Sequence, residues 1–283
     1  MNYGIVVDSG CDLKHLCTQA NTPIDFTRVP LSLDIGNKVF ADDINLDVKS
    51  YMEEMYAYKG KTGSAAPSPE VFLKAYEKSN HVFVITVTGS LSASYSSACI
   101  AGDLFRKYYP DRNIHLINSK SAGPQMTLIV RKIAALIEQG LSFDEIVTEI
   151  NAYQRQTHLL FVLRTLDNLV KNGRVSKLKA KMAGILGIKI IGEATKEGII
   201  AIIEQCRGKT IAYNRVVELL PSYHYAGGKV VIAHCFAEDI AQSLADSITS
   251  IYPGCEIELM PTSGLCSYYA EQGGILIGFD EQP

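Results

Sequence analysis

The densest group of hydroxyl side chains in the chain follows a short run of β-branched and apolar residues. Residues Val82–Val87 are typical of a buried strand, and Ser90, Ser92, Ser94 and Ser96 come next, before a predicted helix. A turn that leads from a strand into a helix presents unpaired backbone N–H groups and hydroxyls beside the positive end of the helix dipole. The stretch therefore predicts recognition of an anionic group, a carboxylate or a phosphate.

Three other predicted loops are also rich in small and hydroxyl residues: 8–10, 62–69 and 119–123. Three of the four loops follow a predicted buried strand. In a doubly wound sheet such loops meet at the carboxyl ends of the strands, where ligands bind. Two interpretations stay open: the loops form one pocket, or they are ordinary turns and helix caps, in which Ser and Gly are common.

Other kinds of site have little support in the sequence. There is no GxSxG motif, and none of the six histidines stands in a Gly- or Ser-rich loop, so a hydrolytic triad is not favoured. The cysteines are scattered and no HxxxH pair occurs, so we expect no metal site. The adjacent Asp42 and Asp43 are read as a solvated turn, with a cation site as the alternative. No phosphate-binding P-loop or GxGxxG fingerprint is present.

Composition narrows the class of protein. The chain has 283 residues, 47% of them hydrophobic, which is enough for one or two domains. Its 27 basic and 30 acidic residues nearly cancel, so nucleic acid is not an expected partner. We expect no signal peptide and no membrane span, and seven cysteines without a CxxC pair suggest free thiols. The prediction is a cytoplasmic protein.

The order of the predicted elements indicates an α/β fold. Buried strands at 3–7, 82–87 and 114–118 alternate with helices, and Ser142 and Glu145 have the spacing of a capping box. This pattern predicts right-handed βαβ units and a mostly parallel sheet. We also expect strands at 28–33 and 38–40, a loop at 62–69, and helices from Asp12, Leu46 and Pro69.

The pattern changes near residue 158, after which short strands outnumber helices. We expect strands within the segments 159–163, 188–191, 198–204, 229–235, 256–260 and 273–279. The predicted organisation is an N-terminal domain over 1–157, with a Rossmann-like parallel sheet, and a C-terminal mixed α/β domain over 158–283.

A second polar cluster lies between Leu163 and Ile191. An amphipathic helix is predicted to end at Asn172-Gly173, and Arg174 follows directly, either as a partner for an acid group or as an ordinary surface cation. The apolar run at 183–191 either lines a cavity or fills the core.

Taken together, these motifs resemble those of the DegV family, a group of bacterial fatty-acid-binding proteins. The similar segments span nearly the whole chain: IVVDSGCDL (5–13), VPLSLDIGNKVFADDINL (29–46), SAAPSPEVF (64–72), TGSLSASYSSA (88–98), NSKSAGPQ (118–125) and LDNLVKNGRVSK (166–177). Each motif is modest alone, but their order and spacing are specific.

The resemblance implies a two-domain α/β protein that holds a long-chain fatty acid of roughly sixteen to eighteen carbons in a tunnel between its domains. It implies no catalysis and no cofactor other than the bound acid. By correspondence with the family's motifs, the carboxylate ligands are Ser64 and Ser92. Thr62 is an alternative to Ser64. The accessory residues are Ser94, Arg174 and Thr262.

The implied partners are the fatty acid, a fatty acid kinase that phosphorylates the carboxylate, and, transiently, a membrane surface. Three departures from the family pattern stand out: Ala93 replaces a glycine, Ala66 replaces a glutamine, and Thr262 replaces a histidine near the head group. The replacement of the histidine by Thr262 affects the expected coupling to a kinase and leaves the expected lipid binding unchanged. Two alternatives remain: a serine esterase or phosphotransferase acting on a small carboxylic acid, and a module that binds a non-lipid anion.

Overall fold

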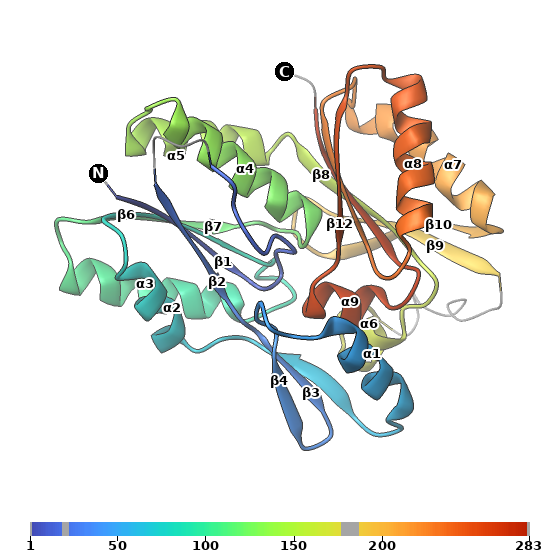
Figure 1. The fold of residues 1–283 in the computed structure, drawn as a ribbon, viewed down its shortest axis with the longest axis horizontal. Helices are drawn as coiled ribbons and strands as arrows, with labels where there is room; N and C mark the ends of the chain where they lie inside the picture. The colour runs from blue at the N-terminus through green and yellow to red at the C-terminus, as the bar shows by residue number, and fades with distance from the viewer. Residues whose placement is uncertain (1, 19–22, 177–186, 282–283) are drawn as a thin grey trace.

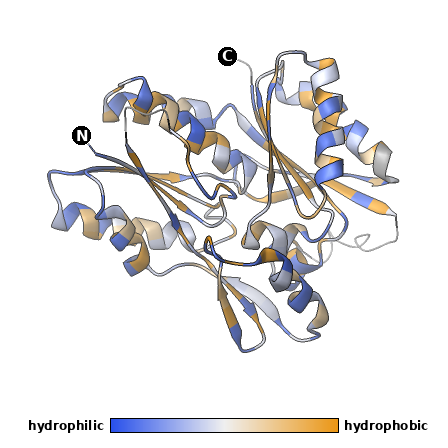
Figure 2. Cartoon of the chain, in the orientation of Figure 1, coloured by the Kyte–Doolittle hydropathy of each residue, from blue (hydrophilic) through white to orange (hydrophobic). Residues whose placement is uncertain are grey.

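The computed structural model describes residues 2–18, 23–176 and 187–281 (Figure 1). Two larger sheets and one small sheet form the framework in these residues. Orange, apolar residues concentrate along the strands of both larger sheets, and blue residues mark the outward faces of the helices (Figure 2).

The first sheet is fully parallel, as predicted. It contains β1 (Tyr3–Asp8), β2 (Ile24–Val29), β6 (His81–Thr86) and β7 (Asn113–Asn118) in the order β2-β1-β6-β7. Helices α2 (Pro69–Tyr76) and α3 (Ser94–Tyr108) pack on one face, and α4 (Pro124–Glu138) and α5 (Phe143–Gln154) pack on the other. Both faces of this sheet are covered, and β1 and β6 are mostly apolar, which made these two strands recognisable in the sequence.

The second sheet is mixed and has six strands. They are β8 (Thr157–Leu163), β9 (Ile188–Ala194), β10 (Ile200–Arg207), β11 (Lys229–His234), β12 (Glu256–Pro261) and β13 (Ile275–Asp280), in the order β10-β9-β8-β13-β11-β12. Helices α7 (Lys209–Leu219) and α8 (Glu238–Ile251), with the short 3₁₀ helix η1 (Leu220–Tyr223), cover its outer face. Helix α4 packs against both larger sheets and joins the two layers into one core.

A small antiparallel sheet flanks the other two. It consists of β4 (Lys38–Ala41), β3 (Ser32–Ile35) and β5 (Thr62–Ala65), in that order. Helices α1 (Val48–Ala57), α6 (Asp167–Lys171) and α9 (Gly264–Ala270) share an apolar cluster with it. The prediction of a loop over 62–69 is wrong for its first four residues, because Thr62–Ala65 pairs antiparallel with β3.

Two other local predictions are corrected. Residues 12–18 form no helix, since Arg28 donates to the carbonyl of Cys11 and the Asp12 side chain binds the backbone of Ser263. The helix expected before Asn172 is limited to α6. The capping box at Ser142 and Glu145 is confirmed. Within the apolar run 183–191, residues 183–186 lie outside the described residues. The domain boundary at 157/158 stays a prediction, although β8 begins at Thr157 and belongs to the second sheet.

Among the described residues, no helix has the length and apolar character needed to cross a bilayer.

Candidate functional site

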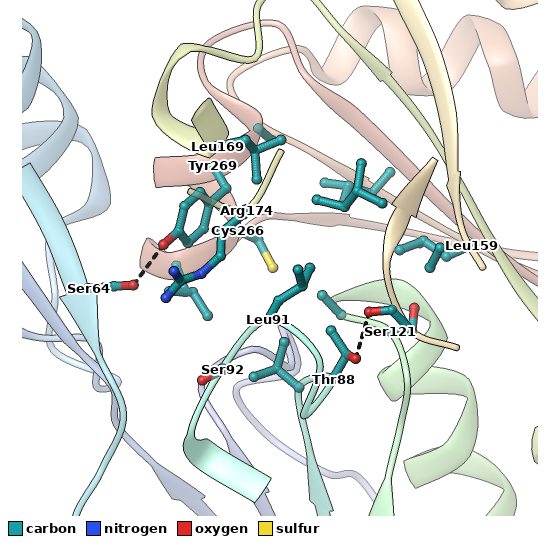
Figure 3. A pocket seen from close by; sticks show the side chains of 18 of the residues that line it. Ser64, Thr88, Leu91, Ser92, Ser121, Leu159, Leu169, Arg174, Cys266 and Tyr269 are labelled. Carbon is teal, nitrogen blue, oxygen red and sulfur yellow. Dashed lines mark hydrogen bonds between the residues drawn. The ribbon is translucent and has the colours of Figure 1, made fainter. Parts of the chain in front are cut away.

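A cavity of about 340 Å³ lies between the first sheet, the second sheet and the small sheet (Figure 3). Apolar side chains from all three regions form most of its wall: Leu31, Val87, Leu91, Leu159, Phe161, Leu163, Leu169, Ile199, Ile200, Leu265 and Leu276. A mostly apolar cavity with a few convergent polar groups is the usual form of a small-molecule site.

One end of the cavity is polar. The hydroxyl of Ser64, on β5, shares a hydrogen bond of 2.9 Å with the hydroxyl of Tyr269, on α9. The half-buried guanidinium of Arg174 lies beside this pair in Figure 3, and its Nη1 donates to the carbonyl of Asn172 at 2.7 Å. Two hydroxyls and a guanidinium are suitable donors for a carboxylate.

Ser92 lines the cavity from the turn between β6 and α3. Its Oγ accepts from the backbone N–H of Ser94 at 3.2 Å, where helix α3 begins. The hydroxyl proton of Ser92 therefore remains available to donate to a ligand. The start of a fifteen-residue helix lies next to this hydroxyl, so its positive end favours an anion here.

The turn is held by the buried carboxylate of Asp8. This group accepts from the N–H groups of Gly10 at 3.0 Å and Val87 at 2.9 Å, and from the hydroxyl of Ser94. Burial raises the pKa of Asp8 to about 6, although these three donors act in the opposite direction. The loop at 8–10 thus holds the Ser-rich turn in place through the Asp8 side chain and does not itself line the cavity.

Of the six residues predicted from the sequence, Ser64, Ser92 and Arg174 meet at this cavity within the described part of the chain. The other three are not among the residues that line it. Ser94 donates to Asp8, and Thr62 shares a hydrogen bond of 2.8 Å with the hydroxyl of Tyr268. Thr262 is buried and shares a hydrogen bond of 2.7 Å with Ser267. Their roles as ligands stay predictions.

Sequence reasoning missed Tyr269, the partner of Ser64. It also assigned Asp42 to a solvated turn, whereas this side chain is 1% exposed and forms an ion pair with Arg28 at 3.3 Å. Asp42 also accepts from the N–H groups of Gly264 at 3.0 Å and Leu265 at 2.8 Å, at the start of α9. The paired-Asp motif was the only signal for Asp42 and there was none for Tyr269, because the Asp42–Gly264 and Ser64–Tyr269 contacts join residues more than 200 positions apart.

Among the described residues, the cavity wall contains one other reactive group, the thiol of Cys266. In the ranges that the structure describes, none of the six histidines is among the lining residues, and no group of three His, Cys, Asp or Glu side chains is placed to hold a metal ion. Cys266 lines the cavity, but burial raises the pKa of its thiol well above the ordinary value. The polar side chains of the wall that the structure describes are hydroxyls, a thiol and a guanidinium.

Known proteins resemble the chain over its whole length. The family model described as "Uncharacterised protein, DegV family" matches residues 2–281. A DegV domain-containing protein of Streptococcus pyogenes serotype M18 is 46% identical over 280 residues, which are 99% of this chain and 100% of that protein.

Two solved structures share both fold and sequence with the chain. One is the fatty acid kinase (Fak) B3 protein of Streptococcus pneumoniae loaded with linoleic acid, with a TM-score of 0.97, 42% identity and full coverage of both chains. The other is a DegV family protein of Eubacterium eligens loaded with heptadecanoic acid, with a TM-score of 0.94, 36% identity, and coverage of 99% of this chain and 100% of that one. The chain described here belongs to the DegV family.

Proposed function

We propose that the protein binds one long-chain fatty acid, with the acyl chain in the apolar cavity and the carboxylate at Ser64, Ser92 and Arg174. The observation that carries the proposal is the polarity of the cavity itself, whose wall is mostly apolar and has a cluster of hydrogen-bond donors at one end. This distribution matches an amphiphile with an anionic head. It does not match a small polar acid, which would leave the apolar wall uncovered.

The energetics favour such a ligand. Burial of about fifteen methylenes at roughly 0.8 kcal/mol each provides a gross driving force on the order of 12 kcal/mol. A carboxylate without partners would cancel much of this gain. Hydroxyl and guanidinium donors at the polar end prevent that loss and set the direction in which the acid lies.

The relatives support a ligand of this class. The proteins at 42% and 36% identity are described as loaded with linoleic acid and heptadecanoic acid. A third DegV family protein, from Ruminococcus gnavus, is 29% identical with a TM-score of 0.89 and is described with vaccenic acid. We infer a ligand of roughly sixteen to eighteen carbons for the present chain.

The proposed role is that of a carrier without turnover of its own, which presents the acid to a fatty acid kinase. The kinase name of the Streptococcus pneumoniae relative supports this partner. Exposed Ala93 and Gly173 flank Ser92 and Arg174, so the polar end of the cavity borders the surface that a partner would approach. All seven cysteines are free, which fits a reducing cytoplasm.

Mass spectrometry of the freshly purified and denatured protein tests the proposal. We expect a fatty acid in near-equal amount with the chain. A preparation that contains no lipid and takes up none from added oleate or stearate would overturn the proposal. Turnover of an acyl ester by the purified chain would instead support the esterase alternative.

Replacement of Ser92 by alanine should weaken fatty-acid binding by about 10- to 100-fold, because a hydrogen bond to a charged group contributes roughly 1.5–3 kcal/mol. Titration with a fluorescent fatty acid measures the effect. Ser96→Ala is the matched control, since Ser96 is exposed on helix α3, directly after the turn that carries Ser92, and does not line the cavity. Equal affinities of the two variants would remove Ser92 from the site.

A further inference from the structure

Two turns from different sheets meet at the side of the cavity away from the polar cluster. Figure 3 shows Thr88 and Leu159 on this side, and Ser64 with Tyr269 on the other. Thr88 lies in the Ser-rich turn that follows β6, and the second turn (residues 195–199) joins β9 to β10. A fatty acid whose carboxylate lies at Ser64 therefore directs the end of its hydrocarbon chain toward the place where the two turns meet.

Two side-chain hydrogen bonds join these turns, and we refer to them together as the clasp. The hydroxyl of Thr88 donates to the carbonyl of Gly198 at 2.8 Å, and the hydroxyl of Ser90 donates to the carbonyl of Glu197 at 2.7 Å. The Thr88 bond is buried, whereas the Ser90 bond is exposed to water, which competes for it. Thr88 therefore contributes the stronger half of the clasp.

Gly198 lets the backbones of the two turns approach closely. Its φ is +76°, a conformation that favours glycine, and a Cβ added there would lie 2.2 Å from Oγ1 of Thr88. The same Cβ would lie 2.9 Å from the Cα of Lys120, in the neighbouring loop. The turns thus close this side of the cavity through a backbone contact that leaves no space for a side chain at position 198.

The cavity wall is thin where the clasp holds it. Ile199 lines the cavity and is also 43% exposed, so the inner surface of the wall and the outer surface of the protein meet at this residue. Across the contact, Leu91 of the Ser-rich turn lines the cavity and is half-buried. Parting of the two turns would therefore connect the cavity to the solvent beside two apolar side chains, with loss of the clasp.

We propose that the clasp limits the length of the acyl chain that the protein binds, with Thr88 as a specificity-determining residue. The proposal rests on the fatty-acid-binding function and specifies which chains the cavity accepts. A chain that ends inside the cavity leaves the clasp intact. A longer chain has to part the turns, break both hydrogen bonds and extend past Ile199 toward water. Loss of the clasp therefore weakens the binding of longer chains alone.

Competition between stearate and docosanoate, a longer saturated acid, tests the proposal. Lipid-free protein is incubated with an equimolar mixture, and mass spectrometry of the denatured protein gives the ratio of the two bound acids. Thr88→Val removes the buried hydrogen bond before any ligand binds, so the longer chain no longer has to break it. The ratio of docosanoate to stearate should rise about three- to tenfold over the wild type. Gly198→Ala should also raise this ratio, because its methyl group forces the turns apart.

Thr148→Val is the matched control. The Thr148 hydroxyl also donates to a backbone carbonyl, that of Asp144 at 3.0 Å, but on the exposed face of α5, so its ratio should stay that of the wild type. The proposal fails if neither Thr88→Val nor Gly198→Ala raises the ratio, or if the wild type retains docosanoate as well as stearate. A wild-type protein that binds neither acid would overturn the proposed function itself.

Discussion

Asp42→Ala should lower the free energy of unfolding by about 3–5 kcal/mol, because it leaves the buried Arg28 without its counter-ion. The Asp42 side chain is 1% exposed and that of Arg28 is 7% exposed, so water cannot replace the missing partner. The carboxylate also accepts from two N–H groups at the start of α9, which would lose their acceptor in the variant. Urea denaturation followed by circular dichroism measures the change.

The effect should extend to the cavity. Helix α9 carries Tyr269 and Cys266, both of which line the cavity, so release of its first turn should loosen the polar end. Glu54→Ala is the control, since Glu54 pairs with Lys38 at 2.6 Å in a largely exposed salt bridge. Such bridges contribute about 0–1 kcal/mol. If both variants lose equally little stability, the buried ion pair is not a structural anchor.

Stability should fall by several kcal/mol as the pH rises from about 4 to about 7. Burial raises the pKa of Asp8 to about 6 and that of Asp12 to about 7. In the unfolded chain both groups titrate near the ordinary value of 3.8, so within this window the folded state binds more protons than the unfolded state. The stabilising effect is present in acid and is lost as the pH rises through the folded pKa values. Chemical denaturation at a series of pH values measures the slope.

Asp12→Asn separates the two contributions. Asp12 accepts from the N–H of Ser263 at 2.7 Å through Oδ1, which an amide oxygen can replace, while Oδ2 has no hydrogen-bond partner among the described residues. The variant should therefore be more stable than the wild type above about pH 7, by roughly 2–4 kcal/mol, and show a smaller slope with pH.

Asp8→Asn provides the contrast. Its carboxylate accepts from three donors, and an amide cannot accept from all of them. This variant should have a smaller slope with pH but a lower stability throughout. An unchanged slope in both variants would show that these two groups do not dominate the titration.

Much of the fold follows from local sequence patterns. The strands over 3–7 and 82–87 are buried and almost entirely apolar, and the strand over 114–118 is mostly apolar, which marks all three clearly. The capping box at Ser142 is likewise a local device. Strand β5 was missed because its residues, TGSA, include no large apolar side chain, and its strand character comes from pairing with β3, some thirty residues earlier.

Site residues that belong to a sequence motif could be predicted, whereas residues whose role depends on a contact distant in sequence could not. Ser64, Ser92 and Arg174 were identified through their motifs and lie at one cavity. Ser94 belongs to the same motif as Ser92, yet its hydroxyl turns inward because a buried carboxylate from β1 lies within reach. Tyr269 has no local signal, since its role depends on a serine 205 positions earlier in the chain.

The cavity also affects the stability of the folded chain. Protein interiors rarely contain holes larger than a water molecule, and a hole forfeits the dispersion contacts of its lining. The apolar lining of this space of about 340 Å³ therefore lacks dispersion contacts that a bound acyl chain would supply. A ligand that binds only the folded chain raises its stability in proportion to the logarithm of ligand concentration. Lipid supply would then set how much of the newly made protein survives cellular proteases.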